Sequence, residues 1–91
     1  MQIEYDEAKW QRTLADRGLD FRDATQLLSG LHVIIKDDRR DYPEDRFLVY
    51  GLLKDRLVMF AYTPIGDRMR IISMRKCNDR GKARFNRWLG R

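Results

Sequence analysis

Residues 68–77, with the sequence RMRIISMRKC, decide how the rest of the chain is interpreted. Apolar and β-branched residues are interleaved with charged ones, and the turn-forming residues 64–67 precede them, so this segment is predicted to be a strand. It contains four cations and no acid. A strand that buries Ile71 and Ile72 holds the arginines at its ends firmly, and firmly held cations suit a site that handles phosphates.

Strand alternation limits which of these cations share a face. In a regular strand, Arg68 and Arg70 point to one side of the sheet, whereas Met69 and Ile71 point to the other. By the same alternation, Arg75 points to the side of Met69 and Ile71, opposite to Arg70. Arg70 and Arg75 therefore reach one site only if the strand ends or twists before Arg75.

The composition is that of a globular chain. Ninety-one residues, 43% hydrophobic and 36% charged, indicate one domain over residues 1–91. No apolar run has the length of a membrane span, and the first residues lack the features of a secretion signal. The single cysteine, Cys77, cannot form an internal disulfide. These features lead us to expect a cytoplasmic protein that does not interact with membranes.

The positive charge is concentrated in the last quarter of the chain. Residues 68–91 contain nine Lys or Arg and one acid, whereas residues 1–67 contain ten bases and thirteen acids. A concentrated positive face favours a polyanion partner such as RNA, DNA or an acidic protein. The alternative is a solvated, salt-screened surface helix.

Turn and capping residues divide the chain into eight elements. The pattern predicts a strand at 2–5, a helix that Asp6 caps and Gly18 ends, a second helix between Asp20 and Gly30, strands at 31–35, 47–53, 57–62 and 68–77, and a last helix capped by Asn78 or Asp79. The order β-α-α-β-β-β-β-α predicts an α+β domain. Its antiparallel sheet of four or five strands would be accompanied by two N-terminal helices and one C-terminal helix.

Several kinds of chemistry have no support in the sequence. One His and one Cys do not make the usual zinc site, and neither GxGxxG nor a P-loop occurs, so no cofactor is expected. The acids at 37–38 and 44–45 would allow a magnesium-dependent nuclease, but acids in a loop are usually solvated. Metal-free cleavage of RNA remains, because RNA carries its own nucleophile, the 2′-hydroxyl. Arginines would then neutralise the phosphorane, and a side chain would accept the proton.

Residues 70–77 (RIISMRKC) resemble the RIIS-x-RKA signature of the BrnT family, the toxin half of bacterial type II toxin–antitoxin pairs. The start at residues 5–9, the segment 17–24 and the E-x-R spacing of residues 44–46 also resemble the family pattern. The resemblance implies a RelE-like fold and a metal-independent ribonuclease that blocks translation. It implies a BrnA-like ribbon-helix-helix antitoxin as partner, with DNA contacted only through that antitoxin.

The resemblance also suggests roles for individual residues. Arg46, Arg70 and Arg75 would contact the phosphate and the transition state. Glu44 would accept a proton or orient an arginine, and Lys76 would bind phosphate or donate a proton. Further contacts with RNA are expected from the basic residues Arg68, Arg80, Lys82 and Arg84.

The chain departs from the family pattern at three positions that bear on these roles. Arg17 stands where the family usually has His, Gly81 where it often has Glu, and Phe85 where Tyr is usual. The assignment of the base and the acid therefore stays open. The alternative function is a non-catalytic basic module that binds nucleic acid or a protein. In that case Arg70, for example, would pair with an acid of the first helix and be structural.

Overall fold

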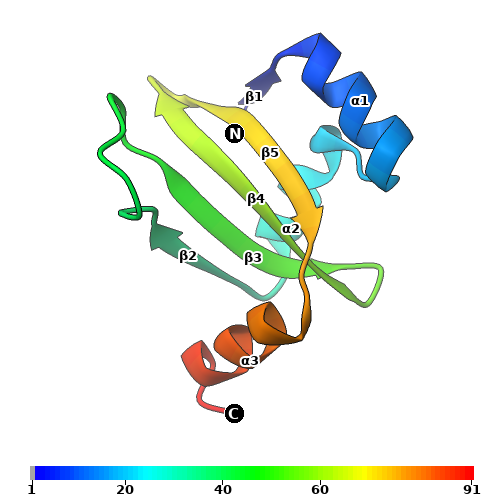
Figure 1. Cartoon of the computed structure of the whole chain (residues 1–91), viewed down its shortest axis with the longest axis vertical. Coiled ribbons are helices and arrows are strands. Elements are labelled where there is room, and N and C mark those ends of the chain that lie inside the picture. The colour runs from blue at the N-terminus through cyan, green and yellow to red at the C-terminus, as the bar shows by residue number, and fades with distance from the viewer. Residues whose placement is uncertain (1) are drawn as a thin grey trace.

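The residues that the computed structural model describes, 2–91, fold into a five-stranded sheet with helices on both of its faces (Figure 1). The elements follow the predicted order β-α-α-β-β-β-β-α. They are β1 (Gln2–Tyr5), α1 (Glu7–Arg17), the 3₁₀ turn η1 (Phe21–Asp23), α2 (Ala24–Ser29), β2 (His32–Lys36), β3 (Phe47–Leu53), β4 (Arg56–Ile65), β5 (Arg68–Lys76) and α3 (Asp79–Trp88).

The strand order across the sheet is β1-β5-β4-β3-β2. Strands β2 to β5 form the predicted antiparallel meander, and β1 adds to β5 as a parallel pair. After β1 the chain passes through α1 and α2 to the far edge of the sheet. The meander then returns strand by strand until β5 lies beside β1 in the same direction. The α+β class is confirmed, and this parallel edge is the detail that the strand pattern did not predict.

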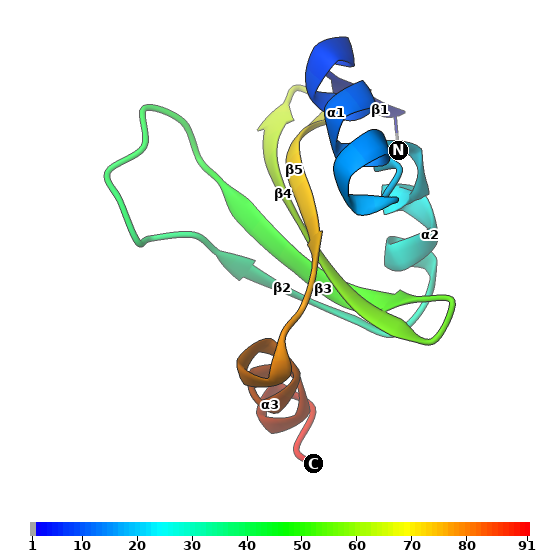
Figure 2. The ribbon, with the colours of Figure 1, turned by 45° about the vertical axis from the view of Figure 1, so that its right-hand side comes forward.

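The two faces of the sheet are covered differently. Helices α1 and α2 lie on one face, whereas α3 and the loop between β2 and β3 lie on the other (Figure 2). The first face buries a core that includes Phe21 and Leu27, both fully buried. The second face has a smaller core, to which α3 contributes Phe85. Because α3 covers only one end of this second face, the rest is left for side chains of the sheet and its loops.

Local capping explains where the helices begin and end. The Asp6 carboxylate accepts a hydrogen bond from the backbone N–H of Lys9 at 3.0 Å, and Gly18 ends α1 in the left-handed conformation with φ of 67°. The Asn78 side chain accepts from the N–H of Gly81 at 3.0 Å and caps α3. The predicted caps are thus confirmed, although the second helix begins as the 3₁₀ turn η1.

Strand β4 is longer than predicted. It continues through Pro64 to Ile65, and only Gly66 and Asp67 form the turn. Proline usually ends a strand because it has no N–H to donate. Strand β3 pairs with β4 only as far as Tyr62, so Pro64 lies where β4 has a free edge and the missing donor leaves no ladder bond unmade.

The turn between β3 and β4 places two non-glycine residues in the left-handed region. Lys54 has φ of 51° and Asp55 has φ of 65°. A two-residue hairpin turn with both φ values positive favours Asn-Gly because a side chain in this conformation is strained. This hairpin turn therefore contains removable strain.

We predict that Asp55→Gly stabilises the fold. Relief of left-handed strain is worth about 1–2 kcal/mol, and the extra flexibility of glycine in the unfolded chain offsets about 0.5–1 kcal/mol of it. Urea unfolding should show a net gain. The control is Asp67→Gly in the next hairpin, where φ of the aspartate is not positive. That variant should lose stability, and an equal gain in both variants would contradict the account.

Candidate functional site

Strand β5 carries a bulge at Ile72. On the neighbouring strand β4, Tyr62 lies opposite Ile71, but the preceding residue, Ala61, lies opposite Ser73. Ile72 therefore has no partner on β4 and is an extra residue. A bulge of this kind resets the alternation of side chains along the strand.

The bulge brings Arg70 and Arg75 to the same face of the sheet. Ile71 and Met74, three residues apart, both point into the core beneath the N-terminal helices and are 2% and 0% exposed. The two arginines lie on the other face, which α3 covers only in part. The irregularity that the parity argument required before Arg75 is thus present.

A cavity of about 200 Å³ lies on this second face, and we call it the arginine cavity. Its floor is apolar and made of buried side chains of β3 and β4. Four guanidinium groups surround it, from the end of α1, the β2–β3 loop, the residue before β3, and β5. The lining residues are Arg17, Arg39, Arg46, Arg75, Ser73, Leu48, Met59 and Ala61.

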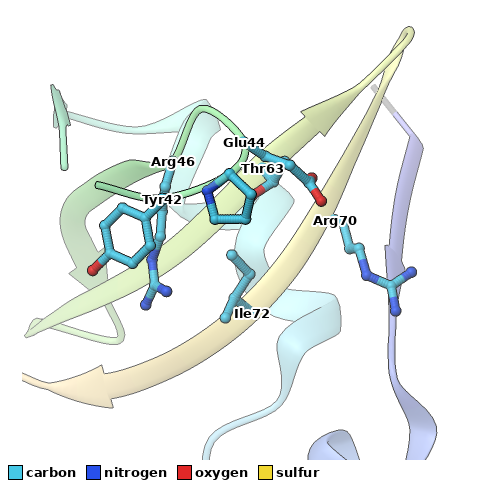
Figure 3. Close-up of a pocket in the computed structure, with 7 residues that line it drawn as sticks. Tyr42, Glu44, Arg46, Thr63, Arg70 and Ile72 are labelled. Atoms are coloured by element: carbon cyan, nitrogen blue, oxygen red, sulfur yellow. The ribbon is translucent and has the colours of Figure 1, made fainter. Parts of the chain in front are cut away.

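Two further cavities flank the arginine cavity along β5. The Tyr42 cavity, of about 260 Å³, shares Arg46 with it and is also lined by Tyr42, Pro43, Glu44, Thr63, Arg70 and Ile72 (Figure 3). The Cys77 cavity, of about 270 Å³, shares Arg39 and Arg75 with it and is also lined by Tyr50, Lys76, Cys77, Asn78, Arg80, Gly81 and Arg84. Seven of the nine predicted site residues therefore line this row of cavities: Glu44, Arg46, Arg70, Arg75, Lys76, Arg80 and Arg84.

Arg68 and Arg70 are both paired with one acid of β1. Nη1 of Arg70 donates to Oε2 of Glu4 at 2.7 Å, and Nη1 of Arg68 lies 3.1 Å from Oε1. Figure 3 shows Arg70 extending toward β1 and away from Arg46. The acid that pairs with Arg70 thus comes from the first strand, and not from the first helix as the structural alternative had it.

Arg68 and Lys82 lie apart from the row of cavities. Lys82 is 3.8 Å from the carboxylate of Asp79, one turn earlier in α3, and lines a separate cavity beside Phe85. Helical spacing places Arg80 and Arg84 on one side of α3, toward the Cys77 cavity, and Lys82 on another.

Asp37 is the acid around which the arginine cavity is organised. Its side chain is 0% exposed, and its carboxylate accepts from Nε and Nη2 of Arg39 at 2.8 and 2.9 Å. It also accepts from the Tyr42 hydroxyl at 3.3 Å and lies 3.4 Å from Nε of Arg46. Hydrogen bonds from Arg39 lower the pKa of Asp37 to about 2, against the opposing effect of burial. The expectation that the loop acids are solvated is wrong for Asp37.

Asp37 also orients Arg46 indirectly, through the side chain of Tyr42. The Arg46 guanidinium lies over the ring of Tyr42 at 4.7 Å, and Tyr42 is itself held by Asp37. Sequence reasoning missed Asp37 and Arg39, although the D-x-R spacing after a strand was a signal. Residues two apart on extended backbone share a face, and an acid and an arginine so placed can pair.

Arg17 also reaches the arginine cavity, from the last turn of α1. Its Nη1 donates to the backbone carbonyl of Met74 at 2.8 Å. Strand β1 pairs with β5 only as far as Ile71, so this carbonyl has no strand partner on that side. No local pattern in the sequence could reveal this role, because the contact spans 57 residues.

The other two departures from the family pattern are Gly81, which lies beside Cys77, and Phe85, which belongs to the smaller core on the second face. A Cβ atom at Gly81 would lie 3.1 Å from Cβ of Cys77, so glycine leaves room beside this half-buried thiol. Burial raises the pKa of Cys77, and Arg75 and Lys82 oppose that shift. Phe85 is buried against the sheet, as expected of a core residue.

Within residues 2–91, no group of three His, Cys, Asp or Glu side chains is placed to hold a metal ion, and none of the helices has the length and apolar character of a membrane span.

A sheet face lined with guanidinium groups is typical of proteins that bind phosphates or other polyanions. The model of one such family, the BrnT ribonuclease toxin of type II toxin–antitoxin systems, matches residues 5–81, so the chain belongs to this family. The predicted resemblance is confirmed. A search of curated proteins gave no match. Family membership identifies RNA as the substrate and an antitoxin as the partner.

We predict that Asp37→Asn destabilises the protein in a pH-dependent way. The folded-state pKa of Asp37 is about 2 and lies below the ordinary value, so its ionised form stabilises the fold above the unfolded-state pKa. That contribution, on the order of 2 kcal/mol, is lost as the pH falls from about 5 to 2. Urea unfolding of both proteins at several pH values should show a gap that closes in this range. A gap that stays constant would contradict the account.

Proposed function

We propose that this chain is a metal-independent endoribonuclease that cleaves RNA at the arginine cavity and so blocks translation in the cytoplasm. The observation that supports the proposal is the convergence of four guanidinium groups on one cavity with a buried apolar floor. Planar guanidinium groups bind phosphate in a fork and keep their charge at all working pH values. Fixed cations of this kind stabilise the charge that develops on a pentavalent phosphorane.

The reaction needs one base and one acid besides these cations. The 2′-oxygen of the RNA attacks the adjacent phosphorus, so a 2′-O–P bond forms and the bond to the 5′-oxygen breaks. A base takes the proton of the 2′-hydroxyl, and an acid gives one to the leaving 5′-oxygen. The products are a 2′,3′-cyclic phosphate and a 5′-hydroxyl.

Glu44 and Lys76 are the residues that we propose for the two proton transfers. Glu44 is the one carboxylate among the described residues that line the three cavities, and it lines the Tyr42 cavity. Lys76 lines the Cys77 cavity at the other end of the row. Neither residue lines the arginine cavity itself, so Glu44 as base and Lys76 as acid would each reach the scissile phosphate from a neighbouring cavity. Arg46 and Arg75, each shared between two cavities, would contact the phosphate.

The antitoxin is proposed to cover the same face. An acidic or amphipathic segment of a BrnA-like partner would neutralise the guanidinium groups that bind RNA in the free toxin. The partner's ribbon-helix-helix portion would read the operator DNA. The toxin would then contact DNA only through the antitoxin, and would support repression by stabilising the complex.

We predict that purified chain cleaves RNA in EDTA, and that Arg46→Ala and Arg75→Ala each lower kcat/KM about 10²-fold, since each removes a preorganised cation. The control is Arg56→Ala, which removes the same charge from an exposed position outside the three cavities. All variants are first checked for folding by circular dichroism. Loss of activity in EDTA, or equal losses in all three variants, would contradict the proposal.

A second function, a non-catalytic module that binds polyanions, is favoured by one feature of the site. The described residues that line the arginine cavity include no acid and no imidazole, so the cavity by itself has cations to bind a phosphate but no base. In this case the chain would bind RNA without cleaving it.

We predict that the affinity of Arg75→Ala for single-stranded RNA depends less steeply on salt. The plot of log affinity against log salt concentration should become shallower by about 1, because one phosphate contact is lost. Fluorescence anisotropy at several salt concentrations measures this slope. Cleavage by the same wild-type preparation separates the enzyme from the binding module. An unchanged slope in Arg75→Ala would remove Arg75 from the RNA site under either function.

A further inference from the structure

One carboxylate holds two of the four arginines of the cavity. Asp37 binds Arg39 through Nε and Nη2, and it faces Nε of Arg46 at 3.4 Å. The Nη1 group of Arg39 and both Nη groups of Arg46 make no hydrogen bond to Asp37. They remain available for an anion in the cavity that both residues line.

From this arrangement we infer that Asp37 is a positioning residue that sets Arg39 and Arg46 as a pair on the scissile phosphate. Arg39 thereby becomes a phosphate-contacting residue that neither the family signature nor the charge pattern indicated. The inference rests on the proposed function, in which Arg46 contacts the phosphate. It adds the residue that fixes Arg46 and the second guanidinium that acts with it.

A role in folding alone does not account for the Arg39 contacts. Its side chain is 59% exposed, so it is not needed to close the core. A long flexible side chain on the surface loses rotamer freedom when it is held by two hydrogen bonds. That ordering is useful where a guanidinium must meet a ligand in one orientation.

The contact between Asp37 and Arg46 is loose in the free protein. Nε of Arg46 is buried and has no well-aligned hydrogen bond, although the Asp37 carboxylate is within 3.4 Å. Hydrogen bonds in catalytic sites are often long without substrate and shorten when it binds. A phosphate that draws the Nη groups of Arg46 into the cavity would therefore bring Nε onto Asp37.

Charge and positioning predict opposite effects for Asp37→Asn. Removing the carboxylate makes the cavity more positive, so attraction alone predicts tighter RNA binding and no loss of turnover. Positioning predicts that kcat falls roughly 10²-fold while KM is unchanged or lower, because two guanidinium groups lose their fixed orientation.

The matched control is Asp38→Asn, which makes the same change of charge at the next residue, which is exposed. Its kcat should stay within about twofold of wild type, since surface charges away from the site are screened. If the wild-type chain cleaves RNA and the two variants Asp37→Asn and Asp38→Asn have the same kcat, the inference is overturned while the proposed function stands.

A second pair of variants keeps the test valid if Asp37→Asn does not fold. Arg39→Gln leaves Asp37 with Tyr42 and Arg46, and Arg40→Gln makes the same change of charge at an exposed neighbour. Arg39→Gln should lower kcat at least tenfold, since it removes one positioned donor. Equal activity of the two variants would overturn the inference.

A binding readout separates failure of the inference from failure of the proposed function. In the wild type, a 2′-deoxy dinucleotide, which cannot be cleaved by 2′-attack, should shift the Nε–Hε NMR signals of Arg39 and Arg46 together. Asp37→Asn should uncouple or weaken these shifts, and Arg39→Gln, in which only the Arg46 signal remains, should weaken the shift of Arg46. If the wild type does not cleave RNA but shows the paired shifts, the proposed function fails and the Asp37 pair stands. If the dinucleotide moves neither signal, the inference is overturned.

Discussion

One constraint shapes the whole structure: both faces of the sheet are apolar, but the helices fully cover only one of them. Helices α1 and α2 bury the first face, and α3 reaches only one end of the second. Residues such as Leu48 and Met59 on the second face are nevertheless 5% and 4% exposed. Arginine side chains line the cavity above them, and arginine can cover apolar surface with its aliphatic stem. Cations, instead of a helix, thus surround this part of the second face.

Arginines that cover a sheet bring like charges close together, and nearby carboxylates offset their repulsion. Asp37 stands among the arginines of the cavity, and Glu4 pairs with Arg68 and Arg70 at the β1 edge. Asp37 is fully buried and in contact with two guanidinium groups, whereas Glu4 is partly exposed. Removing one partner of a buried pair costs more than removing one of an exposed pair. Loss of the Arg39 partner would thus leave a buried charge at Asp37, whereas the Glu4 pairs at the rim stay partly solvated.

Much of the fold was predictable because its signals are local. The caps at Asp6 and Asn78 and the glycine ends of the first two helices were read from short patterns. The parallel pairing of β1 depends on the path of the whole chain, and the extension of β4 through Pro64 depends on where its neighbour ends. Neither is visible in a window of a few residues.

The site was predictable in part for the same reason. The signature strand pointed to Arg70, Arg75 and Lys76, which all line the row of cavities, and the irregularity that the parity argument required before Arg75 is present. Arg17 comes from a helix 57 residues away from its backbone partner, so only the tertiary fold brings it in. Asp37 was missed because an acid in a polar loop is usually solvated, and only the packed loop places it beneath the arginines.

The central claim is that RNA supplies its own nucleophile at a cavity that supplies cations. The most direct test is to identify the ends of the fragments that the chain produces from RNA in EDTA. The account predicts 2′,3′-cyclic phosphate and 5′-hydroxyl ends, and no cleavage where the scissile nucleotide carries a 2′-deoxy group. Fragments with 5′-phosphate and 3′-hydroxyl ends would contradict it, because they require attack by water instead of the 2′-hydroxyl.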